Sequence, residues 1–338
     1  MRSRTVRCAV VALALSLAAC SAGPAAAPTI PHVFDLRHDA ASAIAPVAPQ
    51  RGVVAPADEL RLILERQLSW HGITLVEAMR AAAAGDEAGS RAWIAALVAN
   101  TDDLVTSVGL VYGPAGARAF QQQWAQHTQF LVDDAAAVGR GDHQAQLDAQ
   151  AKLRDYEIDS GSFFDTATGG AAPAAAITAA LRTHVAHMIT QVEDAHAGRA
   201  VDSTALAVAD HTYLGGIATT LAGAMAAQQP RQFPGSVDTS SALYCSLTDQ
   251  RAGAAVLGEI GRSLPHAPGS STSTLARSIG ILPLSEAPEG DVQRLVGLAD
   301  QLAAARRSSD TSATVRGASE LLAAVDRSAR QVVGRPTS

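Results

Sequence analysis

The chain has 338 residues and a formal net charge of −6, and 48% of it is hydrophobic although only 4% is aromatic. This apolar content excludes a disordered chain, and the acidic balance without any basic run argues against a nucleic-acid partner. After the N-terminus no stretch of about 18 uninterrupted apolar residues appears, which argues against a multi-span membrane protein. A composition rich in alanine and poor in aromatic and β-branched clusters predicts an all-α fold.

The first 19 residues have the features of a secretory signal. Three arginines lie within residues 2–7, and the apolar stretch over residues 9–19 is too short for a stable transmembrane helix. It ends in Leu17-Ala18-Ala19-Cys20, which resembles the lipobox of bacterial lipoproteins. The alternative is an ordinary signal peptide that is cut after Ala22 or Ala27.

The lipobox resemblance implies that the chain is cut before Cys20 and that this cysteine is lipidated, with palmitate among the acyl chains. The protein would then be anchored to the cell membrane on its extracytoplasmic face. Cys8 leaves with the signal, so Cys245 would be the one remaining thiol and no internal disulfide could form. Lys152 is the only lysine, and this arginine bias together with the lipobox resembles an actinobacterial lipoprotein.

Residues 20–56 are rich in alanine and proline and predict a spacer between anchor and domain. From residue 57 the apolar residues recur every three or four positions, which is typical of amphipathic helices. Glycine and proline punctuate the pattern and divide it into six expected helices. Their ranges are 60–85, 86–113, 114–139, 142–164, 173–198 and 202–228.

The six helices read as three copies of one helical hairpin. Their markers are histidines at 71, 127 and 184, glycines 14 residues after each histidine, and prolines at 114, 173 and 230. An ancestral repeat explains this regularity, and convergent hairpins with ordinary loop residues are the alternative. In both cases the short loops predict an antiparallel up-and-down bundle over residues 57–235.

Histidine occupies positions on the apolar stripes where leucine is expected. His71, His127 and His184 stand at equivalent places in the three copies, and His211 lies on the stripe of the sixth helix. Imidazoles that meet in one layer of a bundle would suit a transition metal such as Zn, Cu or Fe. The competing interpretation is a set of core histidines, each hydrogen-bonded to a carbonyl or carboxylate oxygen.

Other polar residues give weaker signals. Asn100, Asp102 and Asp103 fall mid-helix and are more consistent with a solvated face than with the histidine layer. Acidic residues follow the histidines at spacings that suit a rim or a supporting shell better than one ligand set; they are Glu77, Asp133, Asp134, Glu193 and Asp194. No nucleophile elbow, phosphate loop or His-Glu-x-x-His motif is present, so the sequence does not predict an enzyme.

Residues 60–235 also resemble an uncharacterised family of secreted bacterial helical-bundle proteins. The shared features are a mid-helix histidine, an Asn-x-Asp-like element, a Tyr-Gly joint, a second mid-helix histidine and a terminal Gln-Phe-Pro. Here they are His71, Asn100 to Asp103, Tyr112-Gly113, His127 and Gln232-Phe233-Pro234. The resemblance implies a helical fold and an extracytoplasmic setting, and it carries no function.

Residues 236–338 form a separate C-terminal region. A helix is expected over 241–262, a loop rich in Ser, Thr, Pro and Gly over 263–290, and two helices over 291–307 and 311–333. A loop this long makes a poor independent core, so we expect the last two helices to dock on the bundle. The sequence as a whole predicts a lipid-anchored envelope lipoprotein that binds an unknown protein or small molecule, with a metal-binding bundle as the alternative.

Overall fold

The computed structural model describes residues 56–237 and 289–332. Within these ranges every regular element is an α-helix, which confirms the all-α prediction. The predicted signal, Cys20, the predicted spacer, Cys245 and the expected helix over 241–262 lie outside the described residues. The helices are α1 (Ala57–Ala83), α2 (Glu87–Arg140), α3 (His143–Ala167), α4 (Ala174–His196), α5 (Ala200–Gln228), α9 (Glu289–Arg307) and α10 (Thr311–Val332).

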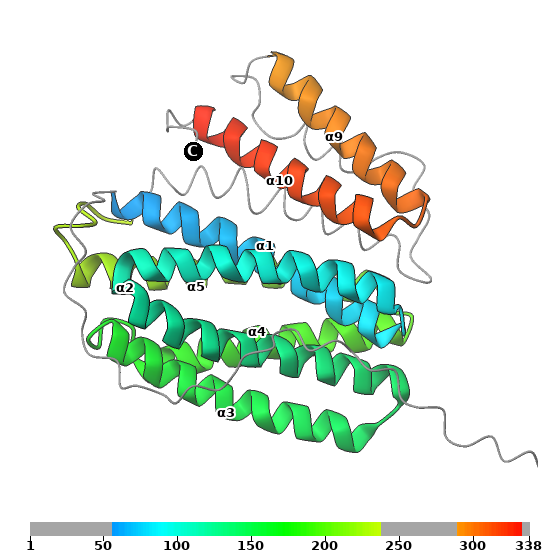
Figure 1. Cartoon of the computed structure of the whole chain (residues 1–338), viewed down its shortest axis with the longest axis horizontal. Helices are drawn as coiled ribbons and strands as arrows, with labels where there is room; N and C mark the ends of the chain where they lie inside the picture. The colour runs from blue at the N-terminus through cyan, green and yellow to red at the C-terminus, as the bar shows by residue number, and fades with distance from the viewer. Residues whose placement is uncertain (1–55, 238–288, 333–338) are drawn as a thin grey trace, which may run out of the picture. The chain divides into compact units, whose positions relative to one another are not determined.

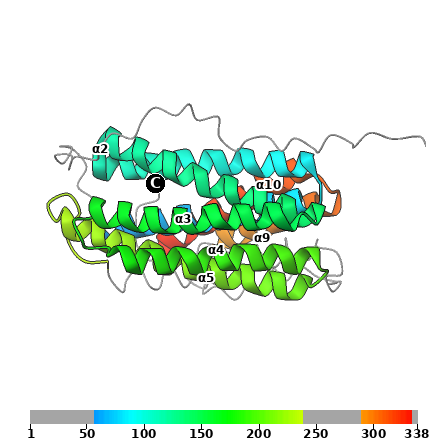
Figure 2. The same ribbon diagram turned by 90° about the horizontal axis from the view of Figure 1, so that it is seen from below.

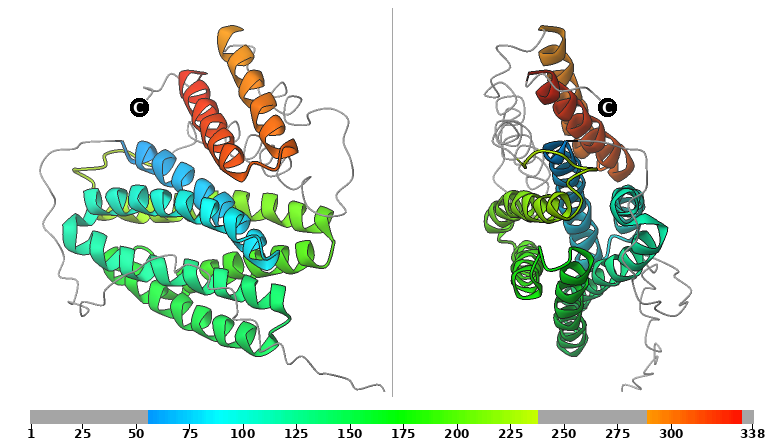
Figure 3. Two further views of the ribbon diagram at one scale, coloured as in Figure 1. Left: turned by 45° about the vertical axis from the view of Figure 1, so that its right-hand side comes forward. Right: turned by 90° about the vertical axis from the view of Figure 1, so that its left-hand side faces the viewer.

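The first five helices form an antiparallel bundle in which chain neighbours pack side by side (Figure 1). α1 packs against the first part of α2, the second part of α2 packs against α3, and α4 packs against α5. The ring closes because α3 also contacts α4 and α5 contacts α1. Figure 2 shows α2, α3, α4 and α5 running nearly parallel to one another, and the right-hand view of Figure 3 shows these helices end-on. The predicted helical-hairpin bundle is therefore present.

The second and third expected helices are joined as one element, α2, with a kink at the expected joint. Gly113 has φ 72° and ψ −177°, a conformation that is essentially restricted to glycine, and Pro114 follows it. Proline lacks the N–H of a continuous helix and has the right φ for a first helical turn, so the second part of α2 restarts there. The kink separates α2 into a part that pairs with α1 and a part that pairs with α3.

The three predicted hairpin turns are correct. Gly85, Gly141 and Gly198 all have positive φ, with values of 70°, 65° and 78°. This left-handed conformation ends a helix and favours glycine, which has no Cβ to clash with the backbone. Two of the following helices begin with an aspartate cap, since Asp86 accepts from the N–H of Gly89 and Asp142 from that of Ala145.

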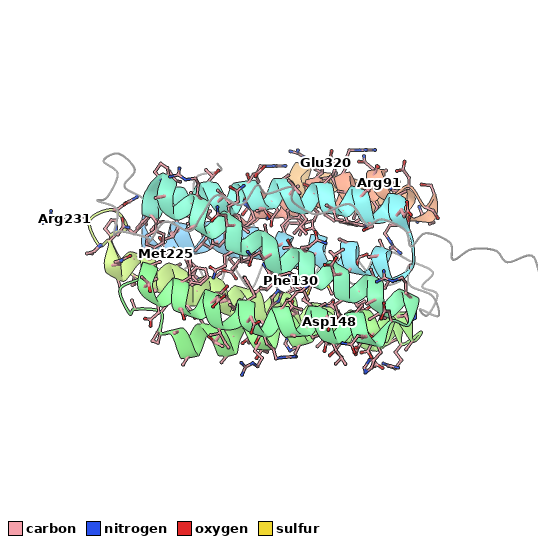
Figure 4. All side chains as sticks on the ribbon, turned by 60° about the horizontal axis from the view of Figure 1, so that its bottom comes forward. Arg91, Phe130, Asp148, Met225, Arg231 and Glu320 are labelled. Carbon is pink, nitrogen blue, oxygen red and sulfur yellow. The ribbon has the colours of Figure 1, made fainter. Side chains whose placement is uncertain are left out.

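Small residues bring helices of neighbouring hairpins close together. A Cβ at Gly139 would collide with the backbone carbonyl of Ala83, and a Cβ at Gly161 would collide with Thr178 and the Ala174 carbonyl. Met225 is buried in the bundle, whereas Arg91 and Asp148 are exposed (Figure 4). The alanine-rich composition thus serves close helix packing, and the larger apolar side chains fill the interior.

Among the described helices, α2 alone is long and apolar enough to cross a membrane. Burial within the bundle explains the apolar composition of α2, because Leu97, Leu104, Val108 and Leu131 are buried against neighbouring helices. It also buries the polar side chain of His127.

The helices α9 and α10 form a second antiparallel pair. Leu295 and Leu302 of α9 and Leu321 and Val325 of α10 are buried, as the predicted stripes require. Contact with the bundle is made through α10, where Asp326 forms an ion pair with Arg66 of α1 at 3.6 Å. This agrees with the expectation that the pair docks on the bundle.

Candidate functional site

Three of the four predicted histidines meet in one buried layer. His71 of α1 has no exposed surface, and His127 of α2 and His184 of α4 are each 2% exposed. The ring centroids of His71 and His127 are 5.3 Å apart, and those of His71 and His184 are 6.1 Å apart. The Nε2 atoms of His71 and His127 face each other at 3.3 Å. The layer therefore combines one histidine from each hairpin.

The His127 ring is oriented by its own helix. Its Nδ1 donates to the backbone carbonyl of Trp124 at 2.5 Å, and a carbonyl oxygen can only accept. In the neutral ring the lone pair therefore lies on Nε2, the atom that faces His71. Trp124 packs against both rings with centroid distances of 4.6 Å, and Tyr156 of α3 stacks on His127 at 4.8 Å. These aromatic rings keep water away from the two Nε2 atoms.

His184 is oriented by Asp210 of α5, a residue that the sequence reasoning missed. The Nδ1 of His184 lies 3.0 and 3.1 Å from the two carboxylate oxygens, and Nδ1 of His187 lies 3.0 Å from one of them. Asp210 is only 2% exposed, so it is a buried acceptor for both rings. A signal was available, because His184 and Asp210 are each 13 residues from Ala197 in the α4–α5 turn and so face each other across the hairpin.

Several ring nitrogens of the layer and its surroundings have no hydrogen-bond partner among the described residues. They are Nδ1 of His71, Nε2 of His184 and both nitrogens of His211. Within the described ranges no ring contact joins His211 to the other three histidines, and it lines a cavity beside α1 and α2 instead. We therefore leave His211 out of the three-histidine layer, defined as His71, His127 and His184.

Burial and mutual repulsion keep His71 and His127 uncharged. Burial lowers the pKa of His71 well below its ordinary value, and the nearby His127 and His184 lower it further. Burial, followed by His184, lowers the pKa of His127 from 6.5 to about 3, against a smaller opposing effect of its hydrogen bond to Trp124. Both rings are therefore neutral at neutral pH, which leaves a lone pair on each for a hydrogen bond or a metal.

The carboxylate beside the layer is held in its charged form. Burial acts to raise the pKa of Asp210, but the charges and hydrogen bonds of His184 and His187 outweigh it and lower the pKa. The hydrogen bond from Asp210 in turn raises the pKa of the half-buried His187. An ionised carboxylate on Nδ1 is the usual way in which a protein orients a metal-binding histidine.

The acidic residues near the histidines in sequence make other contacts. Glu77 pairs with Arg80 at 2.5 Å, Asp134 accepts from Gln150 at 3.0 Å, and Asp194 pairs with Arg199. This fits their expected place outside the ligand set.

Among the three polar positions predicted to lie on a solvated face, Asp102 and Asp103 are exposed. The prediction is wrong for Asn100, which is 2% exposed because its amide donates to the Gln67 carbonyl of α1.

The described residues contain no group of three or more His, Cys, Asp and Glu arranged to hold a metal ion as it stands. One pair nevertheless has matching dimensions. Two imidazole nitrogens bound tetrahedrally at about 2.0 Å lie about 3.3 Å apart, with ring centroids about 5.2 Å apart. His71 and His127 have these separations, at 3.3 and 5.3 Å. His184 lies farther out, at 6.1 Å from His71, so it must approach by about 1 Å to complete a set of three.

A scan against protein-family models and searches of curated proteins and of solved structures give no match to this chain. The arrangement of the residues themselves is therefore the basis for assigning a function.

Proposed function

We propose that this protein is a lipid-anchored, extracytoplasmic bundle that binds one transition-metal ion through Nε2 of His71, His127 and His184. The observation that carries the proposal is the facing pair of Nε2 atoms at 3.3 Å, since this separation equals the nitrogen–nitrogen edge of a tetrahedral site. A set of imidazole nitrogens suits Zn²⁺ or Cu²⁺ and does not suit Mg²⁺ or Ca²⁺, which prefer oxygen ligands.

The fixed Nδ1 atoms support the same role. Trp124 and Asp210 accept from Nδ1 of His127 and His184, which leaves Nε2 of each ring as the nitrogen available to a metal. Without metal, Nε2–H of His71 faces the lone pair of His127. With the proton of its ring on the unpartnered Nδ1, His71 would hold a metal through Nε2 as the third ligand. Complete burial of the layer favours binding or storage over turnover of a substrate.

The test is metal binding by the full chain in detergent. After removal of metal with a chelator, the protein is dialysed against Zn²⁺ or Co²⁺, and bound metal and thermal unfolding are measured. We expect one ion per chain and a gain of about 2.7 kcal/mol in stability when free metal is 100 times the Kd.

Matched variants assign the site. His127→Gln and His184→Gln should lose the bound ion, whereas His143→Gln should keep it, because His143 is exposed at the start of α3. The proposal is refuted if the wild type binds no metal, or if all three variants bind it equally.

Membrane anchoring is the second part of the proposal, and it is supported by the lipobox-like Leu17-Ala18-Ala19-Cys20. In cells grown with labelled palmitate, we expect label on the wild type and on Cys245→Ala but none on Cys20→Ala. Label that persists on Cys20→Ala would contradict lipidation at this residue. The outcome is independent of metal binding, so either half of the proposal can fail alone.

A further inference from the structure

A second polar site lies beside α1 and α2. A cavity of about 300 Å³ is lined by residues of α1, α2, α5 and α10. Gln67 and Trp70 come from α1, Asn100 and Asp103 from α2, and His211 from α5. Leu322 and Val325 are among the residues that α10 contributes. This volume is at the lower end of the range for small-molecule sites.

Two buried amides line this cavity in a fixed orientation. Nδ2 of Asn100 donates to the Gln67 backbone carbonyl at 2.9 Å, and Nε2 of Gln67 donates to Ser107 Oγ at 2.9 Å and to the Asp103 backbone carbonyl at 3.2 Å. Backbone carbonyls can only accept, so neither amide can be turned around. Oδ1 of Asn100 and Oε1 of Gln67 then remain as acceptors with no partner among the described residues.

Unpartnered buried acceptors are costly, at about 1–3 kcal/mol each. Both side chains are more than nine-tenths buried, and they stand on neighbouring helices that face one cavity. Apolar side chains of the same size at these two positions would avoid the cost. The arrangement is explained if a ligand with hydrogen-bond donors occupies the cavity.

The charged residues that line the cavity indicate the sign of the charge on that ligand. The carboxylates of Asp103 and Asp326 outnumber the single cation, Arg66, and Arg66 is already paired with Asp326. Asp103 is exposed on α2 at the edge of the cavity. The ring of Trp70 adds an aromatic surface, which attracts cations and packs well on aliphatic chains. Acceptor oxygens, excess negative charge and an indole together complement an organic cation.

We infer that this cavity binds a small organic cation that carries a primary ammonium group. The ammonium N–H groups donate to the amide oxygens of Asn100 and Gln67, Asp103 balances the charge, and the aliphatic part packs against Trp70 and Leu322. A quaternary ammonium has no N–H to donate and fits less well. This inference does not depend on the proposed metal site.

The test is binding of n-butylammonium to the full chain in detergent, measured by calorimetry and by tryptophan fluorescence, to which Trp70 contributes together with Trp93 and Trp124. We expect saturable binding that weakens as salt is raised, since the charge interaction at Asp103 is screened. Tetramethylammonium should bind at least about tenfold more weakly, the equivalent of about 1.4 kcal/mol, because it cannot satisfy the two amide oxygens.

Adjacent aspartates provide the matched control. Asp103→Asn should weaken butylammonium binding by about fivefold, whereas Asp102→Asn should leave it unchanged, because both residues are exposed on α2 but only Asp103 lines the cavity. Asn100→Ala should weaken binding as well. The inference is overturned if butylammonium does not bind, if n-butanol binds equally well, or if the two aspartate variants are indistinguishable.

Discussion

Acid should destabilise this fold through its buried histidines. An unfolded histidine takes up a proton near pH 6.5, whereas His127 in the fold does so only near pH 3, and the pKa of His71 is also lowered well below 6.5. Both folded pKa values lie below the unfolded ones, so the unfolded chain binds more protons between these values. Stability is therefore complete above about pH 6.5 and falls as the pH is lowered through that value.

The size of the effect follows from the difference in proton uptake. Between pH 7 and pH 5, the unfolded chain gains about 2 kcal/mol from protonation of each histidine that stays neutral in the fold. His127 alone then costs about 2 kcal/mol, and His71 adds to this cost in the same direction; a typical domain is stabilised by about 5–15 kcal/mol. The result does not depend on the folded pKa of His127, because pH 5 is well above 3.

The assay is urea unfolding of the metal-free chain at pH 7 and pH 5. Other groups also titrate in this range; burial raises the pKa of Asp134 to about 6, which opposes the histidines. A comparison of variants cancels that contribution. His127→Gln should lose about 2 kcal/mol less than the wild type between the two pH values. His143→Gln, which removes an exposed imidazole, should behave as the wild type does.

The reasoning fails if His127→Gln has the same pH dependence as the wild type. That result would mean that His127 is protonated as readily in the fold as in the unfolded chain, and hence that water or a negative charge reaches the layer. It would also remove the basis for treating the layer as a set of neutral ligands.

Three further predictions concern positions with defined environments. Asp210→Asn should lower the free energy of unfolding by about 1–3 kcal/mol and lower the pKa of His187 in an NMR titration, and an unchanged His187 pKa would contradict the hydrogen bond between them. Gly113→Ala should destabilise by about 1–3 kcal/mol in thermal unfolding, because of its positive φ. Gly216→Ala should be neutral or stabilise by up to about 1 kcal/mol, since open space surrounds that helical position, and equal effects of the two changes would refute the assigned strain. His71→Leu removes the unpartnered Nδ1 of His71 but leaves Nε2 of His127 without its donor, so the stability of the metal-free chain should change by less than about 1 kcal/mol while metal binding is abolished; metal binding that persists would contradict the proposed ligand set.

The hairpins were predictable because their signals are local. Glycines at 85, 141 and 198 mark the turns, and each adopts the left-handed conformation that ends a helix. The Gly113–Pro114 joint was located correctly for the same reason, because the backbone leaves the helical conformation at Gly113 and the two expected helices meet there within α2.

The partners of the polar side chains were much less predictable. Asp210 was missed because its contact with His184 crosses a hairpin, and helical periodicity describes only one helix at a time. Asn100 was assigned to a solvated face, yet it is buried because α1 supplies a carbonyl for its amide. His211 lies on a stripe as expected, but the rotation of α5 turns it toward the cavity. Each of these outcomes depends on the rotation of one helix against another.

The histidine layer itself follows from the turns. Each of its three histidines lies 14 residues before a turn glycine, which corresponds to about 21 Å of helix at 1.5 Å per residue. The three turns are at equivalent ends of the hairpins, so the imidazoles are at one height in the bundle. Each ring points inward because its histidine lies on the apolar stripe of its helix. His71, for example, lies on the stripe between Leu68 and Leu75. The equal spacing from the turns sets the height of each histidine in the bundle, and its place on the apolar stripe sets the direction of its side chain. The three imidazoles therefore meet without any sequence feature that links distant parts of the chain. Only the final orientation of each ring depends on groups outside the repeat pattern, namely the Trp124 carbonyl and the Asp210 carboxylate. A metal would therefore stabilise a layer that the hairpin arrangement already assembles, and the orientation of the His127 and His184 rings is the part of the proposed site that is already present without metal.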